Sequence, residues 1–144
     1  MSTRDTGDDR GYYVEGLAAA PGCRAGAFDM VCCLQNGVSA FKVEPEHLLA
    51  TVLEAARPGG RALFSSYAAA FWDERLEWFR IQSGHNLVGE IDEAATGDGR
   101  IVCKDGFIAT TFDERDFRAL SAACGREPLV ETVAGSCLFC EFTA

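Results

Sequence analysis

Basic residues are scarce in this chain, and long apolar runs are absent. The 144 residues include 13 lysines and arginines against 22 aspartates and glutamates, a formal net charge of −9. Without a basic cluster, neither nucleic acid nor an anionic membrane is an expected partner. No segment approaches the roughly 20 apolar residues that span a bilayer, and the polar start MSTRDTGDDRG is not a signal peptide. We expect a soluble, cytoplasmic protein.

Metal-ligand patterns are also poor, since the two histidines, His47 and His85, stand alone. Cys137 and Cys140 spell CLFC, which has the spacing of a metal or redox pair. If this run is a strand, residues three apart point to opposite faces and cannot hold one ion. We expect no metal, and we interpret the seven cysteines as reduced core residues. A thiol oxidoreductase is a remote alternative that rests on CLFC alone.

The length fits one domain, because domains most often contain roughly 100–150 residues. With 48% hydrophobic and 24% charged residues, the composition is that of a soluble globular protein. Residues 1–11 are polar and rich in glycine and aspartate, which predicts a disordered leader. Residues 12–144 are predicted to form a single α/β domain.

Short runs of β-branched and aromatic residues predict the strands. FDMVCCL, residues 28–34, is a nearly continuous apolar run, as expected of a strand covered on both faces. RALFSS, residues 61–66, has the same character and ends in hydroxyl residues. The other predicted strands are YYVEG, PLVETV and SCLFCEF, with a hairpin or meander around Gly97-Asp98-Gly99 and Asp105-Gly106.

Three stretches show the apolar spacing of helices. The first begins at Pro45, which suits a first helical turn, and ends before Pro58, because proline disfavours helix in the residue before it. The second covers about 69–83. The third begins after Asp113, a suitable N-cap, and ends at Gly125. Strands alternating with helices predict an α/β sheet covered by helices.

FDMVCCLQNGVSAF, then a helix, then ARPGGRALFSSY resembles the latter half of a class I S-adenosylmethionine-dependent methyltransferase. FWDERLEWF, GEID, IVCKDGFIATTF and SCLFCE are similar to a branch of that family that acts on small molecules. The resemblance runs from about residue 12 to residue 144. It implies a partial doubly wound, Rossmann-like and mostly parallel sheet, with a C-terminal antiparallel strand pair and a β-hairpin insertion.

The resemblance also implies S-adenosylmethionine as cofactor. It places Leu34, Gln35 and Asn36 beside the methionine part of the cofactor, and Leu17 and Ala18 in the same site. The family's Gly-rich loop and the acidic residue that binds the ribose hydroxyls have no counterpart here. Leu17 stands where the family often has an aspartate, and leucine cannot accept that hydrogen bond. We therefore expect the chain alone to bind the cofactor weakly or not at all.

Asn36 is open to two interpretations. Its amide is suited to orient a substrate or the cofactor's amino-acid moiety, whereas the Asn-Gly pair is equally typical of a simple turn. Ser65 and Ser66 likewise end a strand at the functional rim, or else cap the following helix.

Tyr67, Trp72 and Arg75 are candidate acceptor-binding residues, with Phe71 and Trp78 as further pocket walls. An arginine in such a pocket would hold an acid group. The alternative is that the aromatic helical stripe is simple core. No residue is assigned as catalytic, since a loop histidine such as His85 is usually just solvated.

Three functional interpretations remain. The first is methyl transfer to an unknown small-molecule acceptor. The second is a non-catalytic, complementing subunit, because a sheet without its first two strands exposes an edge that a homodimer or a partner chain would cover. The third is a truncated gene product whose longer form carries the Gly-rich loop upstream.

Overall fold

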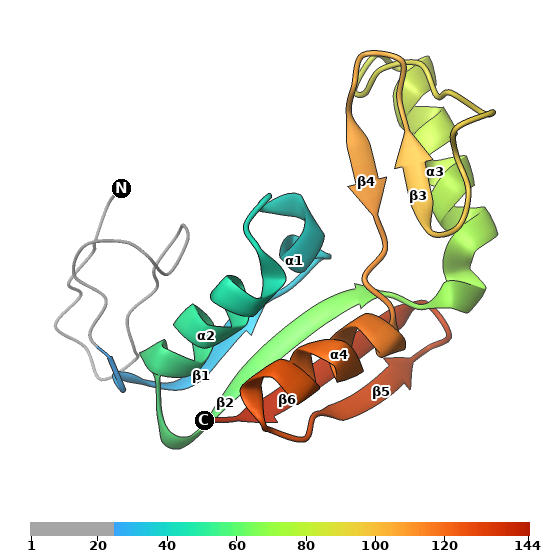
Figure 1. The fold of residues 1–144 in the computed structure, drawn as a ribbon. Helices are drawn as coiled ribbons and strands as arrows, with labels where there is room; N and C mark the ends of the chain where they lie inside the picture. The colour runs from blue at the N-terminus through green and yellow to red at the C-terminus, as the bar shows by residue number, and fades with distance from the viewer. Residues whose placement is uncertain (1–24) are drawn as a thin grey trace, which may run out of the picture.

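The computed structural model describes residues 25–144, and Figure 1 shows their arrangement. The predicted leader 1–11, the predicted strand 12–16 and the site candidates Leu17 and Ala18 lie outside the described residues. The described elements, in chain order, are β1 (Phe28–Cys33), α1 (Gly37–Ala40), α2 (Pro45–Ala55), β2 (Ala56–Tyr67), a 3-10 turn (Ala69–Phe71), α3 (Trp72–Gly84), β3 (Arg100–Val102), β4 (Ile108–Thr110), α4 (Glu114–Cys124), β5 (Leu129–Val133) and β6 (Cys137–Thr143).

A four-stranded sheet in the order β1-β2-β6-β5 forms the centre of the molecule. β1 and β2 are parallel and are connected through α2, as in a βαβ unit. β6 pairs antiparallel with both β2 and β5. The predicted α/β fold with a C-terminal antiparallel strand pair is confirmed, and its parallel part among the described strands is the β1-β2 pair.

Helix α2 forms where the sequence predicts it, with Pro45 in its first turn and Leu48, Leu49 and Val52 buried. The strand after it is longer than predicted, because β2 begins at Ala56 and includes the Pro-Gly-Gly stretch. The β1-β2 pairing shifts register across this stretch. A Cβ on Gly60 would lie 2.8 Å from the Arg57 carbonyl oxygen, so glycine permits the irregular strand.

The core lies on one face of the sheet, where α2 and α4 pack (Figure 1). Ala62 and Phe142 are 0% exposed, and Phe64 is 1% exposed. The Phe64 and Phe142 rings meet edge to face at 6.0 Å. Phe117 of α4 covers Phe64 from above the sheet, with ring centroids 6.3 Å apart.

The opposite face of the sheet, which we call the outer face, is much more accessible. It carries Met30, Leu129 and Val133, which are 48%, 65% and 44% exposed. Cys32 of β1 is exposed on the same face. The expectation that residues 28–34 are covered on both faces is therefore wrong for the described residues, because the described helices α2 and α4 bury only the side of β1 that carries Val31 and Cys33.

Helix α3 and the β3-β4 hairpin form a second, smaller packing unit at the carboxyl end of β2 (Figure 1). Ile91, Ile101 and Cys103 are its buried centre, against which Trp72 and Phe79 pack. The predicted hairpin is confirmed, and Asp105-Gly106 closes it with Gly106 at a φ of 92°. The predicted helix at 69–83 is present as the 3-10 turn followed by α3.

The ends of α4 also agree with the sequence. The Asp113 carboxylate accepts hydrogen bonds from the Arg115 and Asp116 amides, and Gly125 ends the helix in the left-handed conformation. In β6, Cys140 is buried in the core whereas Cys137 is only half-buried, which confirms that the CLFC cysteines point to opposite faces. None of the described helices is long and apolar enough to cross a membrane.

Candidate functional site

Residues 34–37 follow β1 at the carboxyl end of the parallel strand pair, and we call them the β1 lip. Gln35 and Asn36 both adopt left-handed backbone conformations, with φ of 55° and 58°. The Gln35 amide donates to the Ser65 hydroxyl at 2.9 Å, and the Asn36 amide donates to the Ser65 carbonyl at 2.9 Å. The lip is thus fixed to the end of β2 by its own backbone.

The Asn36 side chain connects three parts of the chain. Its oxygen accepts a hydrogen bond from the Ser66 hydroxyl at 2.9 Å, and its Nδ2 donates to the Thr110 carbonyl at 2.6 Å. The Ser66 hydroxyl oxygen in turn accepts from the Phe112 amide at 3.1 Å. The turn interpretation fits this geometry, since Asn36 adopts a left-handed conformation and its side chain binds neighbouring segments of the chain. A role toward a substrate or the cofactor stays a prediction.

Ser65 and Ser66 do not cap the following helix. The cap positions of the 3-10 turn and of α3 belong to Ala68 and Phe71, and neither end has a side-chain cap. The two hydroxyls instead tie β2 to the β1 lip and to the segment after β4. The capping interpretation is wrong, because both hydroxyls are hydrogen-bonded to the β1 lip and to the Phe112 amide instead.

Three of the five residues predicted to bind the methyl donor, Leu34, Gln35 and Asn36, lie on the lip, and Leu17 and Ala18 lie outside the described residues. Leu34 is 46% exposed and Asn36 is 6% exposed, while Gln35 is exposed at the surface. The exposed side chains of Leu34 and Gln35, one apolar and one an amide, suit the methionine part of S-adenosylmethionine. The lip sequence LQNG has no carboxylate, however, so it cannot provide the acidic partner that ribose hydroxyls need. The described residues of the lip therefore fit one portion of the cofactor and not the whole.

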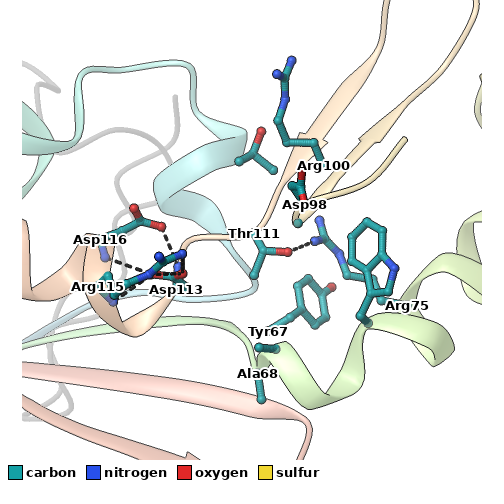
Figure 2. Close-up of a pocket in the computed structure, with 13 residues that line it drawn as sticks. Tyr67, Ala68, Arg75, Asp98, Arg100, Thr111, Asp113, Arg115 and Asp116 are labelled. Carbon is teal, nitrogen blue, oxygen red and sulfur yellow. Dashed lines mark hydrogen bonds and ion pairs between the residues drawn. The ribbon is translucent and has the colours of Figure 1, made fainter. Parts of the chain in front are cut away.

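A cavity of about 670 Å³ opens beside the lip at the end of β2, and we call it the Tyr67 cavity (Figure 2). All three predicted acceptor-binding residues, Tyr67, Trp72 and Arg75, line it. The two further candidate walls, Phe71 and Trp78, are not part of its lining, and Trp78 is 57% exposed. The complete lining consists of Tyr67, Ala68, Ala69, Trp72, Arg75, Asp98, Gly99, Arg100, Thr110, Thr111, Asp113, Arg115 and Asp116.

Arg75 is the most unusual residue of this cavity, because it is a charged side chain that is only 2% exposed. It donates from Nη1 to the Thr111 hydroxyl, as Figure 2 shows. Its guanidinium lies 4.6 Å from the Tyr67 ring centroid and 5.7 Å from that of Phe79. Its Nε is buried and has no hydrogen-bond partner among residues 25–144. Burial lowers the pKa of the Arg75 guanidinium, and the nearby Tyr67 acts in the opposite direction.

The charged groups of α4 at the cavity wall are engaged with one another. Arg115 forms an ion pair with Asp113 at 2.9 Å, and the Asp113 amide donates to the Asp116 carboxylate at 2.8 Å. Burial raises the pKa of Asp113, but hydrogen bonds from Arg115 and from the α4 amides outweigh it, so the net shift is downward. The positive charge of Arg115 is therefore already compensated at this end of the cavity.

Several residues that line the cavity were not predicted from the sequence. Asp98, Arg100 and Thr111 come from the hairpin and the segment after it, which return to the cavity only through tertiary folding. The one local signal was the hydroxyl pair Thr110-Thr111 between the predicted hairpin and the Asp113 cap.

The fold matches several solved structures, including the two that follow. A crystal structure of a SAM-dependent methyltransferase from Methanosarcina mazei has a TM-score of 0.56 at 17% sequence identity, over 91% of this chain and 65% of that chain. The PH0226 protein from Pyrococcus horikoshii OT3 has a TM-score of 0.60 at 14% identity, over 89% of this chain and 59% of that one. No family model and no curated protein matches the sequence.

The chain thus has a class I methyltransferase-like fold, which confirms the resemblance at the level of the fold. It spans less than two thirds of the length of both matched structures.

Proposed function

We propose that this chain takes part in S-adenosylmethionine-dependent methyl transfer to a small-molecule acceptor in the cytoplasm. The observation that supports this most is the Tyr67 cavity, which lies at the carboxyl end of β2 in a methyltransferase-like fold. Ligands of open α/β sheets bind at that end of the strands, and a volume of about 670 Å³ is within the usual range for small molecules. Methyl transfer mainly requires two reactants held in line and shielded from water.

In this proposal the lip and the cavity have separate tasks. Leu34, Gln35 and Asn36 would contact the methyl donor, and S-adenosylmethionine supplies the electrophilic methyl group when it is bound. Tyr67, Trp72 and Arg75 would hold the acceptor. The hydrogen bond from Asn36 to the Thr110 carbonyl supports this division, since Thr110 also lines the cavity and places the two regions side by side.

The chain taken by itself is expected to bind S-adenosylmethionine weakly, because its sequence has no Gly-x-Gly-x-Gly stretch and the lip has no carboxylate. The test is calorimetric titration with S-adenosylmethionine, alone and after mixing with a methyltransferase fragment that carries the Gly-rich loop, followed by measurement of S-adenosylhomocysteine. Micromolar binding by the chain alone would overturn the expectation of weak binding. Failure of the mixture to bind the cofactor would count against the methyl-transfer function.

A second candidate function, that of a complementing subunit, is favoured by the outer face of the sheet. Met30, Leu129 and Val133 are roughly half exposed there, whereas sheets of this class are ordinarily covered on both faces. A homodimer or a partner chain that covers this face would bury them. Size-exclusion chromatography with light scattering tests the idea, because a well-behaved monomer would argue against an obligate partner.

A further inference from the structure

We propose that the acceptor is a monoanionic small molecule, a carboxylate with a flat apolar body, and that its carboxylate binds the Arg75 guanidinium. This inference rests on the proposed function and names its substrate class. It comes from one feature of the Tyr67 cavity, a buried cationic side chain at its wall whose Nε has no hydrogen-bond partner among the described residues.

The surroundings of Arg75 compensate its charge only in part. The Tyr67 and Phe79 rings attract the cation through their faces, and the Thr111 hydroxyl accepts one hydrogen bond. None of these groups carries a negative charge. Among residues 25–144, no aspartate or glutamate forms an ion pair with Arg75. A buried cation without an anion is costly, and a carboxylate is the group that best satisfies a guanidinium.

Other positive groups around the cavity are less suited to bind an anion. Arg115 already pairs with Asp113, and the first amides of α4 donate to the Asp113 carboxylate. The positive end of that helix is thus occupied by its own capping residues. Arg100 lies on the exposed side of β3, where water competes for it. The carboxylate is therefore directed to the Arg75 end of the cavity.

The other residues that line the cavity indicate the shape and charge of the rest of the acceptor. Tyr67 and Trp72 contribute aromatic side chains to the cavity that Arg75 also lines, which suits a flat apolar body. The carboxylates of Asp98, Asp113 and Asp116 line the cavity as well and would repel a second negative charge. A single carboxylate on an aromatic or similarly flat skeleton satisfies both features, and a dianion does not.

The experiment titrates the chain, without any methyl donor, with benzoate and 2-naphthoate and with their neutral amides, and it follows binding by NMR. We expect both carboxylates to bind at least about tenfold more tightly than the amides, the usual size of one charge-assisted hydrogen bond. Arg75→Met should abolish this preference, and Arg100→Met, the matched control in the same cavity, should preserve it. Equal binding of acids and amides, failure of both carboxylates to bind at millimolar concentration, or a loss confined to Arg100→Met would overturn the proposal.

Stability separates a binding role from a structural one. Because an unpaired buried charge is a cost to folding, Arg75→Met should melt no lower than the parent chain while it loses the carboxylates. If that variant fails to fold, Arg75→Lys retains the charge and lacks the planar fork, and we expect it to bind the carboxylates at least about tenfold more weakly. Unchanged carboxylate affinity in Arg75→Lys would contradict the assignment.

The outcome is independent of the methyl-transfer tests. Carboxylate binding through Arg75, with no methyl transfer even in the mixture that carries the Gly-rich loop, would leave the carboxylate site intact and remove the proposed function. Methyl transfer to a neutral acceptor, with no carboxylate binding, would overturn this inference and leave the proposed function intact.

Discussion

The Ser66 hydroxyl donates a hydrogen bond to the side-chain oxygen of Asn36 across 2.9 Å, between residues that are 4% and 6% exposed. The same Asn36 side chain reaches the Thr110 carbonyl, 74 positions along the chain. One buried amide therefore connects the end of β1, the end of β2 and the segment between the hairpin and α4. This relationship fixes the position of the β1 lip beside the Tyr67 cavity.

The first prediction distinguishes the role of the Asn36 side-chain amide from the role of its backbone in the turn. Asn36→Gly keeps the backbone at a φ of 58°, which glycine adopts readily, and removes only the side-chain hydrogen bonds. Because Ser66 and Thr110 lose their partner, we expect the free energy of unfolding in urea to fall by about 1–3 kcal/mol. A neutral or stabilising effect would show that Asn36 serves the turn alone.

The second prediction compares the neighbouring serines. Ser66→Ala leaves the Asn36 oxygen and the Phe112 amide without their partner, and we expect a loss of about 2 kcal/mol in the free energy of unfolding. Ser65→Ala, the matched control, removes a single, part-buried hydrogen bond to the Gln35 amide and should cost about 1 kcal/mol or less. Equal losses in parallel denaturant titrations would contradict the network described for Ser66.

The third prediction concerns the start of α4. Asp113→Ala removes the acceptor for the Arg115 and Asp116 amides, so the free energy of unfolding should fall by about 1 kcal/mol. Glu114→Ala is the control, since it removes only an exposed ion pair with Arg118 and should cost a few tenths of a kcal/mol. Thermal unfolding monitored by circular dichroism measures both, and a larger effect at Glu114 would argue against the capping role of Asp113.

Much of the fold can be predicted from local sequence signals. Pro45, Asp113 and Gly125 mark helix ends through their own backbone preferences, and Asp105-Gly106 marks the hairpin turn. The strand 28–34 shows the limit of such signals. Its apolar run predicts burial on both faces, but the sequence does not say which element provides the cover, and Met30 is 48% exposed in the described structure.

The cavity shows the same division between local and tertiary information. Tyr67, Trp72 and Arg75 lie close together in sequence, after a strand that ends at the functional rim, so their common location could be anticipated. Thr111 could not be, because its contact with Arg75 depends on how the hairpin folds back over 36 positions. The orphaned Nε of Arg75 is likewise a property of packing alone.

The last prediction uses the buried thiols as a probe of the core. Burial, with a contribution from Cys32, raises the pKa of Cys33 from 9.0 to about 11. Burial, with a contribution from Cys124, raises that of Cys140 to about 12, while Arg118 acts in the opposite direction. The folded state then holds protons that the unfolded state releases, so stability is complete below pH 9.0 and falls as the pH rises toward 11.

Urea titrations between pH 8 and pH 11 should therefore show a decline that is shallower in Cys33→Ala and in Cys140→Ala, in the pH window that these pKa shifts define. Cavity formation lowers the stability of both variants at every pH, so the informative quantity is the slope against pH and not the absolute value. Leu138→Ala, which truncates a buried side chain of β6 that does not titrate, is the control and should keep the parent slope. Parallel slopes in all four proteins would show that neither core thiol is as shielded as the packing of Cys33 and Cys140 implies.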